Sequence, residues 1–259
     1  REGAGEGVGE LGKGKGREGK EGKEGKGGMK GEGERWAHEV GAVEKGCLLV
    51  ASPFKFEDAQ EYFSQVGFER CCFFVWRAGR GTLTLEWYLQ TVIFVLDHSE
   101  KDGTSGVILN RPIAYTLDSV TLQGNFSIEK FKRVFRKSAL YLGGPVNLDS
   151  MIFLHDVKGL AGSTEIIDGV YTGGIESAIK LAESNAFDPS RARLFAGYSG
   201  WSPGQVQNEI DQGVWYVAAG SKDITTSQCL KLKRPLWRQV LDLMGGKFAA
   251  ISNAYESSD

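Results

Sequence analysis

The stretch from residue 191 to residue 218 constrains the fold of this chain more than any other part of the sequence. Residues 191–198 alternate in the manner of a half-buried strand. Gly197 and Gly200 then bracket a corner, since glycine adopts backbone angles that other residues resist. The apolar side of the strand is formed by Ala192, Leu194 and Ala196. The chain is therefore expected to leave a strand through a sharp glycine corner.

A capped helix and a second strand are expected after this corner. Ser202 is a good N-cap, Pro203 falls at the first helical position, and Gln205 falls at the third. This is a capping box with proline at its usual place. Gly213 is the expected helix stop, and residues 214–218 have the composition of a strand.

The N-terminal segment has a different composition from the rest of the chain. Its first 34 residues contain fourteen Gly, eight Lys or Arg and eight Glu, which bury too little surface to offset their ordering entropy. We expect residues 1–40 to be a disordered tail, residues 41–250 a single domain, and residues 251–259 a flexible C-terminus. Residues 14–19 fit G-x-G-x-x-G, but no strand precedes them, so dinucleotide binding is not expected.

Charge and ligand supply narrow the possible functions. The net charge of −2 argues against a strong general nucleic-acid footprint. The chain has four cysteines and three histidines without any C-x-x-C. We therefore expect no metal site, no cofactor and no disulfide scaffold, and idle thiols in a reducing compartment. No apolar stretch is long enough to span a bilayer. We expect a soluble intracellular protein of the cytoplasm or plastid stroma, with no membrane partner.

Strands and helices are interspersed along the predicted domain. Strands are expected at residues 46–52, 91–97, 106–109, 139–142 and 151–155, and helices at residues 126–136, 174–185 and 236–244. The pair Asp102-Gly103 marks a turn, which predicts a hairpin between the second and third strands. Because several strands are linked in this way, the pattern favours an α+β class with a mixed or antiparallel sheet.

Four motifs occur in an order that resembles one known family. They are Leu48–Pro53, Gly106–Pro112, Gly143–Val146 and Gly197–Trp215. Over residues 45–248 the chain is similar to the AlgH/YqgE family (UPF0301, DUF179), which has bacterial, plant and algal members, and we expect a member of algal or plant type. The resemblance implies a mixed, largely antiparallel bifurcated sheet that forms a pseudo-barrel flanked by helices. Bacterial members are called transcriptional regulators, and no catalytic mechanism is established for the family.

One segment departs from the family pattern. Family members run from the region of Phe63 almost directly into the strand at 91–97, whereas here residues 66–90 intervene, with two cysteines and several aromatic side chains. The segment is either a functional lid, or a retained intron or faulty gene model. Because its flanks join naturally, we expect residues 66–90 to be poorly packed or looped out.

Ser199 raises the hypothesis of a hydrolase. Residues 197–201 approach the G-x-S-x-G pattern in a strand–turn–helix context, but Trp201 stands where the turn requires glycine. A triad also needs a histidine and a carboxylate, and the candidate histidines are His98 and His155. A hydrolase that uses Ser199 is thus the alternative to a structural corner in which this hydroxyl bonds to the backbone.

Another group of residues forms a candidate binding site. The strand end at Asn-Arg-Pro and the N-terminus of the following helix could converge on an anionic ligand. Alternatively, Arg111 pairs with a carboxylate such as Glu209 and braces the fold. We expect Trp201 to anchor the core, and Gly200 and Gly204 to be intolerant of bulk. The candidate binding residues are Asn110, Arg111, Tyr198, Ser199, Trp201, Gln205 and Glu209.

A basic cluster lies within residues 126–137. Its charged residues are Lys130, Lys132, Arg133, Arg136 and Lys137, which suit nucleic acid, an acidic partner, or simply a solvated helix face. The cluster lacks interleaved aromatics and any helix-turn-helix pattern. We therefore expect a non-enzymatic regulatory or binding protein that acts through the surface around residues 197–205 on an unidentified protein partner. Direct nucleic-acid binding through residues 126–137 is an alternative.

Overall fold

The structure is a computed structural model that describes residues 35–53, 90–115 and 117–254. The expectations for residues 1–34, for residues 66–89 of the predicted insertion and for residues 255–259 lie outside the described residues. The described residues all belong to the unit Glu32–Asp259, one of the two units into which the chain divides.

The core of this unit is a sheet with strand order β1-β10-β2-β3-β4-β9-β6-β8-β7, with β5 added beside β9. Described neighbours pair antiparallel, apart from β5 and β9, which pair parallel. The strands are β1 (Ala37–Glu39), β2 (Leu48–Ala51), β3 (Val92–Ser99), β4 (Gly103–Ile108), β5 (Leu140–Leu142), β6 (Val146–His155), β7 (Ser163–Ile167), β8 (Val170–Gly173), β9 (Ala192–Trp201) and β10 (Trp215–Gly220). The predicted hairpin is confirmed as β3–β4.

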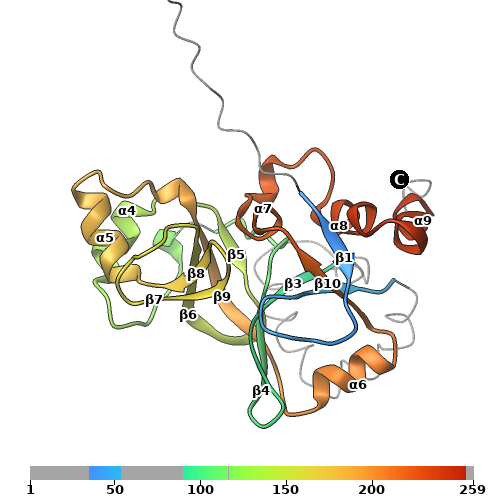
Figure 1. The fold of residues 1–259 in the computed structure, drawn as a ribbon. Helices are drawn as coiled ribbons and strands as arrows, with labels where there is room; N and C mark the ends of the chain where they lie inside the picture. The colour runs from blue at the N-terminus through green and yellow to red at the C-terminus, as the bar shows by residue number, and fades with distance from the viewer. Residues whose placement is uncertain (1–34, 54–89, 116, 255–259) are drawn as a thin grey trace, which may run out of the picture. The chain divides into compact units, whose positions relative to one another are not determined.

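Strand β9 belongs to both halves of the sheet (Figure 1). Its first part pairs with β6 and β5, and its last three residues pair with β4, as in the register of Ser199 with Gly106. The sheet divides at Gly197, whose φ of 67° is left-handed. A Cβ at this position would lie 2.7 Å from the carbonyl oxygen of Gly144, so the division needs glycine at this position.

The burial of β9 corrects the prediction of a half-buried strand. Ala192, Leu194 and Ala196 share one side, as predicted, and pack into a core cluster with Phe131 and Phe153. The opposite side is buried as well, because Phe195 packs into a second cluster there. From Ala192 to Gly197 the strand lies between two cores and is buried on both sides.

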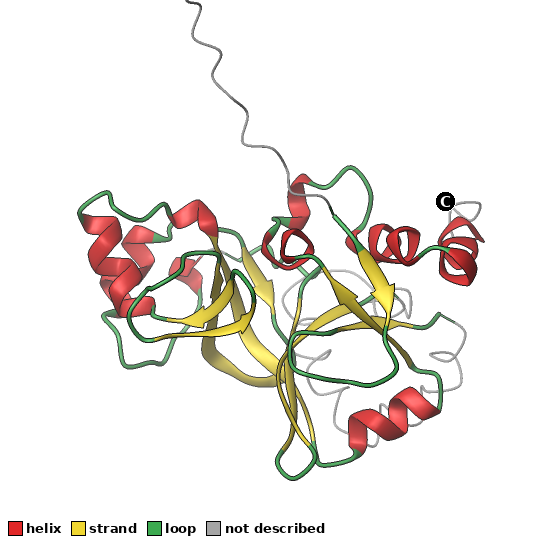
Figure 2. Ribbon diagram, viewed as in Figure 1, coloured by secondary structure: helices red, strands yellow, loops and turns green. Residues whose placement is uncertain are grey.

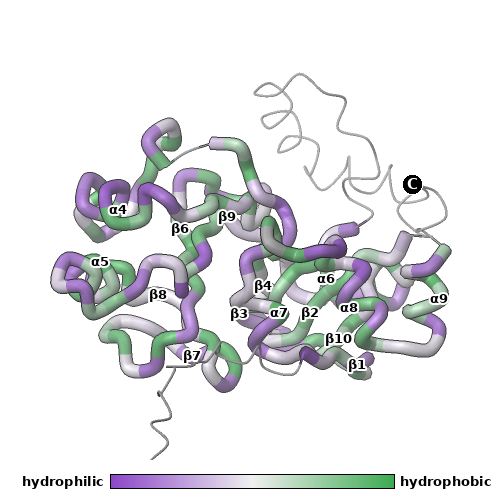
Figure 3. Tube along the Cα trace, turned by 90° about the horizontal axis from the view of Figure 1, so that it is seen from above, coloured by the Kyte–Doolittle hydropathy of each residue, from purple (hydrophilic) through white to green (hydrophobic). Residues whose placement is uncertain are grey.

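Helices cover these cores from several sides (Figures 1 and 2). Helices α4 and α5 pack against each other over one half of the sheet, and the hydrophobic face of α8 enters the other half with Trp237, which is fully buried. The helices are α4 (Ile128–Val134), α5 (Ile175–Glu183), α6 (Gln205–Asp211), α7 (Lys222–Thr226), α8 (Leu236–Met244) and α9 (Gly246–Ala254), with the 3-10 turns η1 (Leu117–Ser119), η2 (Pro189–Arg191) and η3 (Cys229–Lys231). Figure 3 shows hydrophobic colours along β2, β6 and β10 and hydrophilic stretches on α4.

The structure extends the ordered domain at both predicted boundaries. Strand β1 lies within residues 1–40 and pairs with β10, as in the register of His38 with Ala219. Helix α9 continues past residue 250 and buries Phe248 against the ring of Tyr216, with centroids 5.1 Å apart. The N-terminal segment thus adds a strand to the edge of the sheet, and the C-terminal helix adds an aromatic side chain to the core. The α+β class with a largely antiparallel bifurcated sheet and flanking helices is confirmed.

Candidate functional site

The glycine motif at residues 143–146 crosses β9 at the corner. A Cβ on Gly143 would lie 2.1 Å from the carbonyl oxygen of Gly197, so the two backbones touch. The carbonyl of Gly143 accepts hydrogen bonds from the backbone N–H of Ile108, at 2.8 Å, and from the hydroxyl of Ser199, at 3.2 Å. Three of the four sequence motifs therefore meet where the sheet divides, and they hold this junction together.

Ser199 is part of this junction. It is buried, and it lies within β9, which continues to Trp201, whereas a nucleophile elbow places serine on a sharp exposed turn. Nδ1 of His98 bonds to Thr104 at 2.7 Å. His155 pairs with Ala192 at the other end of β9. Among the described residues, the Ser199 hydroxyl donates to the backbone carbonyl of Gly143 rather than to a histidine.

Glu209 is the centre of the corner that follows β9. The residue is 2% exposed. Its carboxylate accepts hydrogen bonds from Nε1 of Trp201 at 2.9 Å, Nε1 of Trp215 at 2.7 Å and Nε2 of Gln205 at 3.1 Å. The two indole rings meet edge to face, with centroids 6.4 Å apart. A buried carboxylate is tolerated only when donors replace its lost water, and here three side chains of the same motif do so.

This arrangement corrects the expected pairing of Arg111 with Glu209. Arg111 instead donates from Nη2 to Oγ1 of Thr91 at 3.3 Å, and burial lowers the pKa of its guanidinium to about 10. Its neighbour Asn110 accepts from the backbone N–H of Val92 at 3.0 Å. Both residues therefore fasten the end of β4 to the start of β3.

The candidate residues consequently fall into two groups rather than one site. Trp201 pairs with Thr104 at the beginning of β4, whereas Asn110 follows the end of that strand. Six residues of extended chain separate these two positions by about 20 Å. Half-exposed Tyr198 packs against the main core cluster beside the junction.

The start of α6 also differs from the predicted capping box. The helix begins at Gln205 with Gly204 as its N-cap, at a φ of 76°, and without a side-chain cap bond. One half of the box is present, because the backbone N–H of Ser202 donates to the side chain of Gln205 at 3.1 Å. The left-handed glycine delays the helix, so the serine lies outside the N-cap position. A Cβ at Gly200 would lie 3.4 Å or more from other atoms, which corrects the expectation that bulk is excluded there. A Cβ at Gly204 would meet open space, but the φ of 76° at this position still favours glycine.

Arg193 is a buried cation that the sequence analysis missed. Its side chain is 1% exposed and donates to the carbonyl oxygens of Thr225 and Leu109. Its guanidinium carbon lies 4.5 Å from the centroid of the Tyr141 ring. The sequence signal that could have revealed it is a single arginine within an otherwise apolar strand. Its contacts tie β9 to the end of β4 and to α7.

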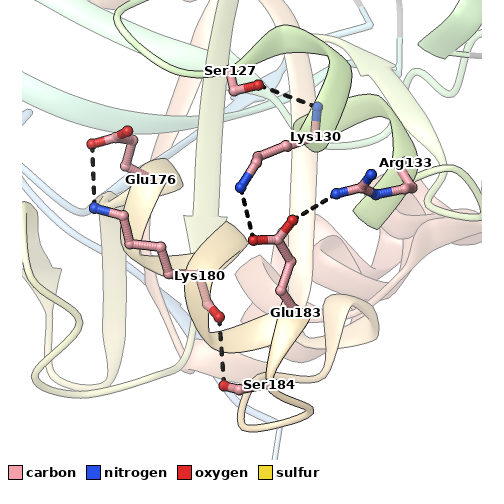
Figure 4. A network of polar contacts seen from close by, with 7 residues as sticks. All are labelled: Ser127, Lys130, Arg133, Glu176, Lys180, Glu183 and Ser184. Atoms are coloured by element: carbon pink, nitrogen blue, oxygen red, sulfur yellow. Dashed lines mark hydrogen bonds and ion pairs between the residues drawn. The ribbon is translucent and has the colours of Figure 1, made fainter.

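Most of the basic cluster on α4 is engaged in contacts within the protein. Glu183 on α5 forms ion pairs with Lys130 at 3.1 Å and Arg133 at 2.6 Å (Figure 4). The hydrogen bond from Lys130 lowers the pKa of the Glu183 carboxyl, and the charge of Arg133 acts in the same direction. Lys132 donates to the carbonyl oxygen of Val120 at 3.0 Å. Figure 4 shows that the two ion pairs of Glu183 join α4 to α5.

Two further observations concern ligands and membranes. The described residues contain no group of three or more His, Cys, Asp or Glu side chains that could hold a metal ion. Cys47 and Cys229 are free thiols, and burial raises the pKa of Cys47 to about 11. Within the same described ranges, every helix is too short or too polar to cross a bilayer.

Fold and corner together define an α+β protein whose sequence motifs build the junction of a bifurcated sheet. The family model described as AlgH-like matches residues 81–249, which is more than half of the chain, and the chain belongs to this family. The resemblance inferred from the sequence motifs is therefore confirmed.

Curated relatives carry the name UPF0301 protein. The one from Chlorobium phaeobacteroides is 32% identical over 171 residues, which cover 65% of this chain and 84% of the relative. The one from Pelodictyon phaeoclathratiforme is 33% identical with the same coverage, and the one from Bacteroides fragilis is 28% identical over 161 residues, or 61% and 76%. These relatives are bacterial, and the algal or plant type of this chain stays a prediction.

Two solved structures have the same fold. The crystal structure of protein DIP2367 from Corynebacterium diphtheriae matches with a TM-score of 0.56 and 22% identity, covering 83% of this chain and 94% of that protein. The solution structure of the AlgH protein from Pseudomonas aeruginosa matches with a TM-score of 0.53 and 18% identity, covering 83% and 96%. At these identities the similarity concerns the fold.

Proposed function

We propose that this chain is a non-enzymatic binding protein of the regulatory type, and that its glycine corner is a scaffold rather than the binding surface that we expected around residues 197–205. One observation carries the proposal: the polar side chains of the richest motif bond to one another and to the backbone. Ser199 donates to Gly143, and the carboxylate of Glu209 accepts from two tryptophans and from Gln205. A site for catalysis needs polar groups that are directed at a substrate.

The hydrolase alternative is disfavoured by the same geometry. A serine nucleophile needs a base within about 2.6–3.2 Å of its hydroxyl. The hydroxyl of Ser199 instead lies 3.2 Å from a backbone carbonyl oxygen. The carboxylate of Glu209, in the same motif, accepts hydrogen bonds from two indole N–H groups. Activation would require the corner to open, at the cost of several buried hydrogen bonds.

Direct nucleic-acid binding through residues 126–137 is the second alternative. Each phosphate contact requires an available cation, and affinity rises with their number. Lys130 and Arg133 share Glu183, and Lys132 bonds to carbonyl oxygens. These contacts leave the segment less able to follow a phosphate backbone than its sequence suggests.

A turnover experiment tests the proposal directly. The full chain and its Ser199→Ala variant are incubated with chromogenic ester, phosphoester and peptide substrates, and both are then used to capture partner proteins. We expect equal background rates for the two proteins and capture of the same partners, because the hydroxyl faces a backbone carbonyl. Turnover by the natural chain that is abolished in the variant would overturn the proposal in favour of a hydrolase.

A further inference from the structure

A groove of about 870 Å³ lies beside the C-terminal end of α4. One wall comes from the end of α4 and the residues after it, and the other comes from η2 and from residues 228–230. Its charged and apolar lining includes Arg133, Arg136, Lys137, Val134, Pro189 and Leu230. The groove is separate from the glycine corner and from the junction of the sheet.

Arg136 and Lys137 are the available cations of this groove. Both side chains are exposed, and within the described residues neither takes part in an ion pair or a hydrogen bond. Arg133 adds a charge that Glu183 partly neutralises. The carboxylate of Asp188 on the opposite wall accepts from the backbone N–H of Ser190 at 2.9 Å, as the cap of η2. The groove therefore offers positive charge on the α4 side.

The groove also exposes an apolar side chain. Leu230 is 65% exposed, more than any other large hydrophobic residue in the described part of the chain. It shares the lining with Val134 and Ala139. Burial of this side chain beneath a bound segment would remove apolar surface from water, which favours association.

Charge and lining together identify the occupant. We propose that the groove binds an acidic segment of a partner protein, with carboxylates on Arg136 and Lys137 and an apolar side chain on Leu230. The inference rests on the proposed binding function and names its surface. Nucleic acid fits less well, because single strands are held by stacking on aromatic side chains, and the described lining contains none.

A defined peptide tests the inference with the full chain. The probe is a fluorescein-labelled synthetic peptide of alternating Glu and Leu, and its binding is followed by fluorescence polarisation. The double variant Arg136→Gln/Lys137→Gln is compared with Lys101→Gln/Lys158→Gln, which removes two exposed cations elsewhere. We expect about fivefold to tenfold weaker binding for the first variant, as for two partly exposed charge pairs, and little change for the second.

Further variants separate the two parts of the proposed contact. Leu230→Ser should weaken binding of the Glu-Leu peptide and leave binding of a Glu-only peptide unchanged. Unaltered thermal melts show that each variant is folded, since these side chains are exposed. Equal losses in both double variants, no binding by the natural chain, or tighter binding of a single-stranded oligonucleotide through the same cations would overturn the inference. These outcomes leave the proposed function intact, whereas turnover that depends on Ser199 would remove the proposed function itself.

Discussion

Nε1 of Trp215 donates a 2.7 Å hydrogen bond to the carboxylate of Glu209, six residues earlier in the chain. This bond closes the loop that leaves α6 and enters β10, and both residues are buried. Trp201 donates to the same carboxylate oxygen from the end of β9. One side chain therefore fixes the spacing of two strands and the helix that connects them.

Glu209→Ala is expected to destabilise the fold strongly. The change leaves the indole N–H groups of Trp201 and Trp215 buried without an acceptor, at about 1–3 kcal/mol for each donor. We expect the free energy of unfolding to fall by about 2–5 kcal/mol, measured by urea melts. Asp211→Asn on the exposed part of the same helix is the control and should change little. An unchanged melting midpoint for Glu209→Ala would show that the carboxylate does not hold the corner.

Trp201→Ala should act on stability rather than on partner binding. The side chain is 9% exposed and packs with Trp215 and Val206, so truncation leaves a large cavity. The expected cost is about 3–5 kcal/mol, a large share of a typical stability of about 5–15 kcal/mol. Chemical melts of Trp201→Ala and Trp201→Phe measure it, and the second should cost less because it keeps an aromatic ring. A normal melt combined with lost partner capture would identify Trp201 as a recognition residue.

Removal of the inserted segment should preserve the fold. The backbone N–H of Ala51 donates to the carbonyl oxygen of Thr91 at 2.9 Å, and β2 pairs with β3. Ala51 and Thr91 are therefore already adjacent, and a shorter connection between them closes a loop at a lower entropic cost. We expect a chain without residues 66–90 to melt cooperatively at the same or a higher temperature in calorimetry. Aggregation or loss of the cooperative transition would show that the segment is required.

Local sequence patterns were sufficient to predict many helices and strands. The arrangement of the candidate site residues depends instead on contacts between residues that are distant in sequence. The apolar run at residues 91–97 predicted a strand, and β3 confirms it. The glycine at position 245 predicted the end of a helix, and α8 confirms it. The partner of Lys130 and Arg133 is Glu183, 50 or more residues further along the chain. Composition could not show that this carboxylate pairs with two of the five basic residues in the cluster.

The same difference explains the errors at the corner. The prediction that Arg111 pairs with Glu209 rested on their opposite charges alone. In the structure, the indole N–H groups of two tryptophans donate to this carboxylate instead. The alternation along β9 correctly grouped Leu194 with its neighbours. It could not reveal a second core on the other side, because that core is assembled from β2, β3 and the C-terminal helices.

Acidification should destabilise the fold through His155. The imidazole is buried and stacked on the ring of Tyr171, and burial lowers its pKa. The folded protein therefore binds this proton less readily than the unfolded chain, whose histidine titrates near pH 6.5. The stabilising contribution is complete above that pH and is lost as the pH falls towards the lower pKa of the folded state. Urea melts between pH 7 and 5 should show a steeper decline for the natural chain than for His155→Gln. Parallel declines would contradict the assignment.

Gly143→Ala should reduce stability strongly and Gly200→Ala should change it little, although both glycines belong to the motifs that identify the family. A Cβ on Gly143 would lie 2.1 Å from a carbonyl oxygen of β9, and neither backbone can retreat without breaking the pairing of the strands. We expect a loss of roughly 3 kcal/mol or more, among the larger effects of single substitutions. A Cβ on Gly200 would lie 3.4 Å from the ring of Tyr198, an ordinary contact, so alanine there should change the free energy of unfolding by less than about 1 kcal/mol. Thermal and urea melts of the two variants give the comparison. Equal stabilities would mean that the crossing of residues 143–146 over β9 is not the tight junction described above.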